Sequence, residues 1–285
     1  LNKVDFNTSA ATSDHVLINI DTHGAYKKSF IAILNHNLNS CSGKIRVASS
    51  GTEANVAAVD MGSATSPSGL TEVVNANGLS GNIITPDSDG STIIKFTESD
   101  DRFWGIQFEG DSTFDGGTDL FIGCILIGEY YDMPHAPDLA VTRMISYNRM
   151  NDLQESFGGQ RFSNLKSYGR TAGSTSKSPF VTTSNAHASY GGRLIYDMSF
   201  SFLDSTDMMP DEYDSLGTSN DSFVDDVWNR TNGNHIPFIF SIDKDSEGDN
   251  AESEHIFGRF ANNSLDMAQV APNVYNIKLT VEEEF

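Results

Sequence analysis

Short apolar segments separated by turn residues run through this chain, and this pattern limits the fold more than any other feature. The segments are rich in β-branched and aromatic residues and are bounded by Gly, Ser, Asn or Asp, as β-strands are. Eight of them in the first half are His15–Ile20, Ser29–Leu34, Lys44–Ala48, Asn55–Val59, Gly69–Val74, Thr92–Phe96, Phe103–Phe108 and Leu120–Ile127. Eight strands at this spacing predict two packed sheets, as in a jelly roll or sandwich.

Two of these segments differ in how their apolar residues are arranged. Phe103–Phe108 alternates in the way expected of a strand with one exposed face. Phe30–Leu34 is apolar on both faces, which is typical of a central strand. We therefore expect Phe30–Leu34 to lie inside a sheet rather than at its edge.

The sequence predicts two domains. Met133–Asp138 contains two prolines after a strong apolar strand, and such restricted positions suit a linker. We expect a jelly-roll β-sandwich over residues 1–133 and a second β domain over residues 134–285 that carries a helix near 215–232, ended by Asn232 and Gly233. The strands expected in the second domain are Val141–Tyr147, Gln160–Lys166, Arg193–Leu203, Ile236–Ile242, His255–Phe260 and Val274–Val281. The predicted fold class is mostly β.

Charge and hydropathy exclude several kinds of partner. The chain has 18 Lys and Arg against 39 Asp and Glu, a net charge of -21, so no nucleic-acid partner is expected. Its longest apolar runs stop far short of the roughly 20 residues that a membrane helix needs, so no membrane span is expected. Cys41 and Cys124 are too few for a disulfide framework and lack the spacing of a metal site.

No common catalytic motif is present. The chain lacks a Gly-x-Ser-x-Gly elbow, a phosphate loop and a His-Glu-x-x-His pair. His23 and His36, with Asp21 and the Asn35–Asn37 amides, contain residue types for a nucleophile and a base, but a catalytic set is recognised by its geometry. The simpler interpretation is that Asn35–Asn37 is a loop whose side chains satisfy backbone groups. We do not predict an enzyme.

An acidic segment matches the spacing of a calcium loop. Oxygen ligands stand at positions one, three, five and twelve, with the sharp-turn Gly248 at position six. The candidate ligands are Asp243, Asp245, Glu247, Asp249 and Glu254. The flanking sequences look like strands rather than the helices of an EF-hand. An acidic hairpin loop without a metal ion would have the same residues. We therefore expect no cofactor, and calcium at this loop is the one alternative that the sequence leaves open.

Aromatic residues beside polar ones supply the chemistry of a sugar site, because rings stack on sugars while neighbouring side chains bind the hydroxyls. One candidate set combines Asp101, Arg102 and Trp104 with the loop residues Asn35, His36 and Asn37. Tyr130 and Tyr131 beside Asp132 form another. The structural alternatives are that Trp104 belongs to the core and that the two tyrosines seal the linker.

Several short segments, taken in order, resemble a known family. They are Ile31–Leu38, Leu120–Gly128 followed by Met133 and Pro134, Glu155–Gln160, Pro237–Asp243, Ile256–Phe260 and Val274–Glu284. Their order is similar to that in tailed-phage virion proteins encoded among tail genes, in which a discoidin-like, galactose-binding-type jelly roll precedes a second β domain. Cys124 stands where that family often has Arg, so an inter-domain role of that Arg does not carry over.

The resemblance implies a function in the virion. It implies a non-enzymatic structural protein at the tail tip, baseplate or fibre-attachment region, made in the host cytoplasm. Such a protein would form a homo-oligomer and contact other virion proteins. The alternatives are a carbohydrate-binding module that attaches to a host glycan, and a capsid-surface decoration protein.

Overall fold

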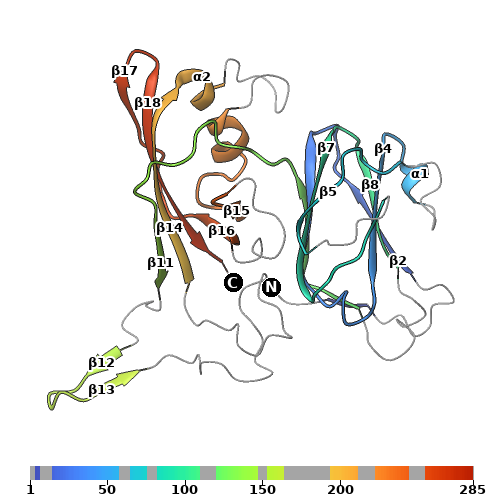
Figure 1. Cartoon of the computed structure of the whole chain (residues 1–285), viewed down its shortest axis with the longest axis horizontal. Coiled ribbons are helices and arrows are strands. Elements are labelled where there is room, and N and C mark those ends of the chain that lie inside the picture. Colours follow the sequence, from blue (N-terminus) through green and yellow to red (C-terminus); the bar gives the residue numbers. More distant parts are fainter. Residues whose placement is uncertain are drawn as a thin grey trace. The chain divides into compact units, whose positions relative to one another are not determined.

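The computed structural model describes residues 4–6, 15–57, 65–75, 82–109, 120–146, 153–163, 193–210, 222–243 and 254–284 (Figure 1). These residues are mostly β-strands in antiparallel sheets, which confirms the predicted fold class. The chain divides into two compact units. One contains Leu1–Asp132 and Ser241–His255, and the other contains Met133–Phe240 and Ile256–Phe285. No helix among the described residues is long and apolar enough to cross a membrane.

The first unit contains two four-stranded sheets in the orders β10-β3-β7-β5 and β2-β8-β4-β6. Their strands are β2 (His15–Asp21), β3 (Lys28–His36), β4 (Lys44–Ser50), β5 (Thr71–Val74), β6 (Ile83–Ile84), β7 (Gly90–Ser99), β8 (Phe103–Glu109) and β10 (Cys124–Gly128). The short strands β1 (Val4–Phe6) and β9 (Leu120–Ile122) pair separately, and helix α1 (Glu53–Val56) follows β4. Figure 1 shows the two sheets as facing layers.

Consecutive strands of these two sheets lie in opposite layers. From β2 to β8, and again at β10, each next strand of the two sheets crosses the sandwich, and no two consecutive strands pair with each other. Every strand pair in either sheet therefore joins segments that are separated in sequence. Such non-local pairing carries a loop-closure cost before any contact repays it. The sandwich must depend on the core between its layers.

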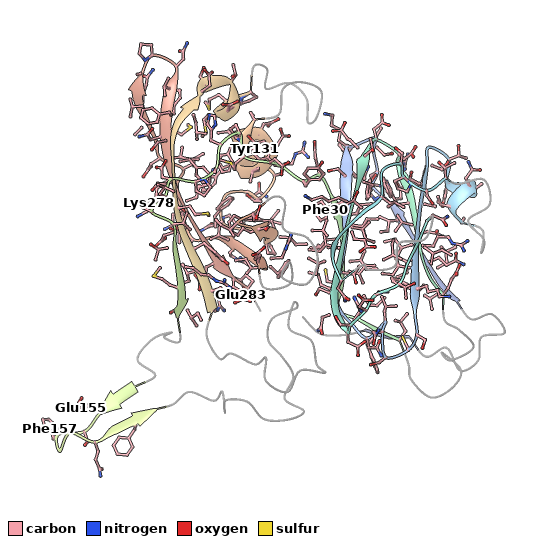
Figure 2. All side chains as sticks on the ribbon, in the orientation of Figure 1. Phe30, Tyr131, Glu155, Phe157, Lys278 and Glu283 are labelled. Carbon is pink, nitrogen blue, oxygen red and sulfur yellow. The ribbon has the colours of Figure 1, made fainter. Side chains whose placement is uncertain are left out.

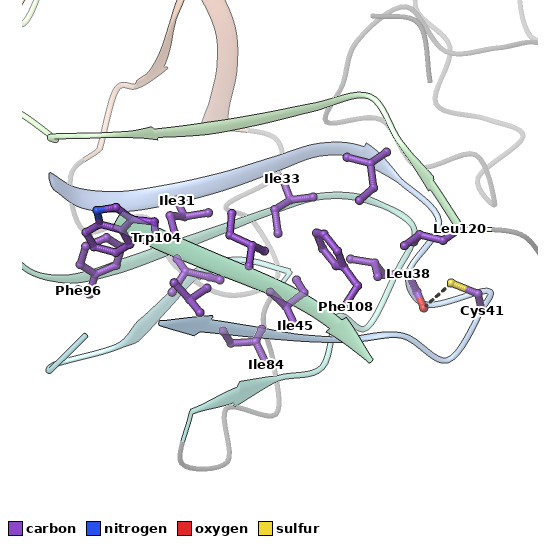
Figure 3. Packing of buried hydrophobic residues seen from close by; sticks show 14 residues of the cluster. Ile31, Ile33, Leu38, Cys41, Ile45, Ile84, Phe96, Trp104, Phe108 and Leu120 are labelled. Atoms are coloured by element: carbon purple, nitrogen blue, oxygen red, sulfur yellow. Dashed lines mark hydrogen bonds between the residues drawn. The ribbon is translucent and has the colours of Figure 1, made fainter. Parts of the chain in front are cut away.

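That core is built from apolar side chains of both sheets (Figure 3). β3 lies between β10 and β7, and its residues Ile31–Leu34 are completely buried, which confirms the predicted central strand. β8 contributes Trp104, Ile106 and Phe108 from the opposite sheet. Burial of such side chains stabilises the folded state by about 1.5–3 kcal/mol each.

The second unit contains a six-stranded sheet in the order β11-β14-β18-β16-β15, with β17 also paired to β18. Its strands are β11 (Thr142–Ser146), β14 (Arg193–Asp204), β15 (Phe238–Ser241), β16 (His255–Phe260), β17 (Met267–Ala271) and β18 (Val274–Glu283). A separate hairpin pairs β12 (Leu153–Glu155) with β13 (Arg161–Ser163). Two helices complete the described part, α2 (Ser205–Met208) and the π-helix η1 (Phe223–Asn229).

One face of the long strand β14 is buried in this unit. Leu194, Tyr196, Met198 and Phe200 are buried, and the residues between them are partly exposed, as the sequence alternation requires. Helix η1 contributes to the same apolar layer. The rings of its Phe223 and Trp228 contact the ring of Phe260, with centroids 6.2 and 5.3 Å apart.

Some predicted elements differ from those observed. The described part of the predicted helix 215–232 contains η1, whereas residues 215–221 lie outside the described residues. The strand predicted at Asn55–Val59 is wrong where it is described, because Glu53–Val56 form α1 and the Asn55 side chain donates to the Ser50 hydroxyl. The strand predicted at Leu120–Ile127 is divided between β9 and β10. The break is at Gly123, where a Cβ atom would lie only 2.9 Å from the Cβ atom of Asn35.

The core of the first unit can be tested at one position. Ile106 is completely buried, so Ile106→Ala should lower the free energy of unfolding by about 2–5 kcal/mol in urea titrations. Leu17→Ala is the matched control. Val16 and Ile18 pack against the core, and Leu17 lies between them on the other face of β2. It should cost about 1 kcal/mol or less. Equal losses for the two variants would contradict the described core.

The acidic end of β18 is paired within the second unit. Glu283 is completely buried, and its Oε2 accepts a hydrogen bond of 3.0 Å from the backbone N–H of Leu194. Arg193 lies 3.2 Å from Glu282, and Arg259 lies 2.7 Å from Glu284. These carboxylates therefore fix the end of β18 to β14 and β16, although the chain as a whole is strongly acidic.

The buried carboxylate predicts a specific loss of stability. Glu283→Ala removes the acceptor of a buried N–H, which should cost about 1–3 kcal/mol of unfolding free energy. Glu283→Gln keeps an oxygen at this place and should cost less. Glu282→Ala, which removes a partly exposed ion pair, should change the free energy by about 1 kcal/mol at most. A Glu283→Ala chain as stable as the unchanged protein would refute this role.

Candidate functional site

The residues predicted to bind a sugar do not form one site. Lys28, at the start of β3, donates from Nζ to the backbone oxygen of Asp101 at 2.9 Å. Asn35–Asn37 lie at the other end of the same strand. At about 3.3 Å per residue, the two groups are separated by about 26 Å of strand. The structure therefore does not bring Asp101, Arg102 and Trp104 together with Asn35, His36 and Asn37.

Trp104 cannot stack on a sugar. Its side chain is 0% exposed, its Nε1 donates to the backbone oxygen of Asp101 at 2.8 Å, and its ring packs on Phe96. The sugar-stacking prediction for Trp104 is wrong because the ring lies on the same face of β8 as Ile106 and Phe108, which belong to the core. The structural alternative, a core tryptophan, is the one observed.

The polar neighbours of Trp104 are also engaged. Arg102 holds Asp21 through two hydrogen bonds of 2.7 Å, from Nε and Nη2. This guanidinium keeps the pKa of the Asp21 carboxyl well below its usual range. The Asp101 carboxylate accepts from the hydroxyls of Ser49 and Ser99, at 2.6 and 3.3 Å. The side chains of Asp101 and Arg102 are therefore already hydrogen-bonded within the first unit.

His36 is a core histidine and not a general base in the described structure. Its Nδ1 accepts from the N–H of Leu38 at 3.2 Å, so its Nε2, 2.9 Å from the Thr92 hydroxyl, is the nitrogen left to donate. Asn37 Oδ1 accepts from the backbone N–H of Phe121 at 2.6 Å, so its amide is also engaged. His23 lies beside Asp21 at the opposite end of the sandwich, so His23 and His36 do not form a common catalytic set.

The remaining aromatic pair lies at the end of the first unit. Tyr130 is exposed, and the Lys95 ammonium lies 4.9 Å from its ring centroid, on one face of the ring. The Tyr130 N–H donates to the hydroxyl of Ser29 at 2.9 Å. This tyrosine is therefore fixed against β3 and β7, and one ring face is already occupied by a cation.

Cys41 is buried and Cys124 is partly buried. Burial raises the pKa of the Cys41 thiol to about 11, and the nearby Asp89 carboxylate adds to the shift. Burial also raises the pKa of Cys124. Thiols with raised pKa values are weak nucleophiles at neutral pH, so both cysteines fit a structural role.

The predicted calcium loop joins two neighbouring strands. Asp243 follows β15 and Glu254 precedes β16, so the flanks are strands, as expected. Asp245, Glu247 and Asp249 lie outside the described residues. Among the residues that are described, no group of three or more His, Cys, Asp or Glu could hold a metal ion. Calcium binding by this loop stays a prediction.

That prediction has a direct test in thermal unfolding. If calcium binds, excess calcium should raise the melting temperature of the unchanged chain, because a ligand of the folded state stabilises it by mass action. Glu254→Gln, which removes the bidentate carboxylate of position twelve, should abolish most of that rise. The same calcium response in both chains, or none in either, would dispose of the site.

Exposed apolar side chains are concentrated in one stretch of the second unit. Of ten large hydrophobic residues that are exposed in the described chain, five lie between positions 139 and 162. They are Leu139, Met144, Ile145, Phe157 and Phe162. Single exposed apolar residues are ordinary, but several within one stretch of sequence make that stretch a candidate for contact with another surface.

Two of these residues lie on an open sheet edge. β11 is the last strand of the six-stranded sheet and has β14 as its only neighbour among the described strands. Its pairing is regular, without a bulge, and it contains no proline. Its only charged residue, Arg143, has its guanidinium 5.6 Å from the ring centroid of Tyr196 on β14. Proteins usually protect an edge strand with bulges, prolines or outward-pointing charges, since an open edge can pair with another chain. Met144 and Ile145 therefore lie on an edge that is able to accept a partner.

The β12–β13 hairpin carries the two exposed aromatic residues of this group, Phe157 and Phe162. Its turn is closed by a hydrogen bond of 2.8 Å from Ser156 N to Gln160 O, and Gly159 takes the positive φ of 80° that the turn needs. Figure 2 shows Phe157 at this turn, where its side chain is fully exposed. A two-stranded hairpin of three-residue strands has little stability of its own in water. A partner surface that covered Phe157 and Phe162 would stabilise it.

The sequence around these residues has an unusual charge. Residues 139–192, here called the basic segment, contain six of the 18 Lys and Arg residues but only two of the 39 Asp and Glu residues. The basic segment thus has a net charge of +4 and the remainder of the chain has a net charge of -25, which together give the total of -21. Its charged residues are Arg143, Arg149, Arg161, Lys166, Arg170 and Lys177, with Asp152 and Glu155.

The sequence predictions missed these exposed residues and the charge of the segment that contains them. The total charge hid the basic segment, and its count of charges by position was the signal that would have revealed it. The exposure of Ile145 and Phe157 could not be predicted from the sequence, because the same residues are equally suited to a core.

Comparison with protein-family models gives no match, and no curated protein matches the chain.

Proposed function

We propose that this chain is a non-enzymatic structural subunit of a tailed-phage virion, at the tail tip, baseplate or fibre-attachment region, which assembles with copies of itself and with other virion proteins. The virion assignment rests on the ordered segments that resemble tail-encoded proteins. The assembly role rests on one observation, the exposed apolar side chains carried by a basic segment in an otherwise acidic chain.

The physical basis of assembly combines burial with charge. Phe157 and Ile145 are exposed in the single chain, and covering each of them would contribute about 1.5–3 kcal/mol. The basic segment of one copy is attracted by the acidic remainder of the next, whereas the acidic remainders of two copies repel each other. A contact between two different surfaces of identical chains is heterologous, and it produces a ring or a helical array.

The molecular mass in solution tests this proposal. The unchanged chain should scatter light as a multiple of 31.0 kDa, and the mass should fall when salt is raised, because the attraction is partly ionic. Ile145→Lys and Phe157→Ser should each shift the mass toward that of the monomer. At a concentration where the unchanged chain is itself monomeric, neither should lower the melting temperature, since both side chains are exposed in the single chain.

Val270→Lys is the matched control for these variants. Val270 is an exposed apolar residue on β17, which also has a single strand neighbour, but it lies outside the basic segment. Its substitution should leave the mass unchanged. A chain that is monomeric at every concentration, or an oligomer that withstands Ile145→Lys and Phe157→Ser, would contradict the proposed contact.

A further inference from the structure

A hollow of about 500 Å³ lies at the end of helix η1, within the second unit. Its volume is in the range of small-molecule sites. The lining consists of Trp228, Gly233, His235 and four asparagines. All of these residues belong to the described chain, and they are distinct from the set that the sequence predicted for sugar binding.

The end of η1 builds this hollow. Asn232 and Gly233 take left-handed backbone angles, with φ of 50° and 65°, and the Gly233 N–H donates to the Trp228 oxygen at 2.8 Å. This turn brings the chain back beside the indole. A Cβ atom at position 233 would lie 3.3 Å from Cζ2 of Trp228, so a glycine leaves this part of the ring free of a covering side chain. The ring also contacts the ring of Phe260, with centroids 5.3 Å apart.

Polar side chains line the hollow together with the Trp228 ring, and some of them have no hydrogen-bond partner among the described residues. Asn234 donates from Nδ2 to Oδ1 of Asn263 at 3.0 Å, which fixes these two amides relative to each other. In the described part of the chain, the side chains of Asn229, Asn232 and His235 make no hydrogen bond. Each amide offers two donors and one acceptor. The hollow therefore presents donors and acceptors beside a half-buried aromatic ring.

The lining carries no formal charge apart from what His235 can acquire, although the chain is strongly acidic. The arginines of neighbouring segments are already paired, Arg230 with Asp226 at 2.8 Å and Arg259 with Glu284 at 2.7 Å. A charged ligand would find no fixed counter-charge here. A purely apolar ligand would leave the amides without partners, which is costly.

We infer that this hollow binds a neutral saccharide. Sugar hydroxyls both donate and accept, which matches the amides of Asn229, Asn232 and Asn263, and the C–H face of a sugar ring can lie against the exposed part of Trp228. The inference does not rest on the proposed assembly role, because the hollow and the basic segment share no residue.

Fluorescence provides the test. The chain has two tryptophans, of which Trp104 is buried and Trp228 lines the hollow, so acrylamide quenching reports mainly on Trp228. The probes are neutral oligosaccharides of glucose, galactose, mannose, rhamnose and N-acetylglucosamine, added one at a time to the full chain. A saccharide that binds should protect Trp228 from acrylamide and should give saturation-transfer signals in NMR.

Two exposed amides give variants that keep the fold. Asn229→Ala and Asn263→Ala should each weaken saccharide binding about five- to tenfold, the loss expected for a hydrogen bond or two, with an unchanged melting temperature. Gln269→Ala is the control, because it removes an exposed amide on β17 outside the hollow. It should bind as the unchanged chain does.

Three results would overturn the inference. The first is the absence of protection and of saturation transfer with every neutral oligosaccharide. The second is equal binding by Asn229→Ala, Asn263→Ala and the unchanged chain, which would place the saccharide elsewhere. The third is a clear preference for acidic sugars over their neutral counterparts, since the lining has no fixed cation to favour them.

Discussion

The core between the two layers of the first unit is the interaction on which that unit depends. Consecutive strands of the two sheets lie in opposite layers, so neither sheet contains a local hairpin that could form first. The strands remain paired because Ile31, Ile33, Trp104, Ile106 and Phe108 are buried together between the layers. Polar groups at the ends of the strands form hydrogen bonds within the unit. Asp101 and Asn37 are used as internal hydrogen-bond partners at opposite ends of the sandwich.

The sequence predicted the fold where hydrophobic periodicity is strong. The alternation in Arg193–Leu203 predicted β14, and the unbroken apolar run Phe30–Leu34 predicted a central strand. Prediction was wrong where a local contact outweighed the pattern. The Asn55 side chain bonds to Ser50 within a helical turn, and Gly123 permits a close approach that ends one strand and begins another.

The predicted site residues were chosen by chemical type, and chemical type does not determine position in a sandwich. Trp104, His36 and Asn37 have the groups of a binding site, but each meets its requirements inside the protein. Whether two polar groups meet depends on which end of a strand each occupies, and Lys28 joins Asp101 at the end of β3 remote from His36. The hollow beside Trp228 was missed because a helix end and a turn bring its amides together.

The two proposals place different chemistry on the second unit. The basic segment is cationic and its described part exposes several apolar side chains, which favours contact with an acidic protein surface. The hollow at the end of η1 is neutral and rich in amides, which favours a saccharide. A subunit of this kind would hold its neighbours through one part of the chain and remain able to bind a glycan through another.

Hydrogen exchange measured in dilute and in concentrated solution tests the central claim most directly, because it reports on individual strands without substitution. If copies assemble through the basic segment, the amides of β11 and of the β12–β13 hairpin should exchange more slowly in the concentrated sample. Exchange in these strands that is the same at both concentrations, while the mass of the particle increases, would show that the copies meet elsewhere and would contradict the account.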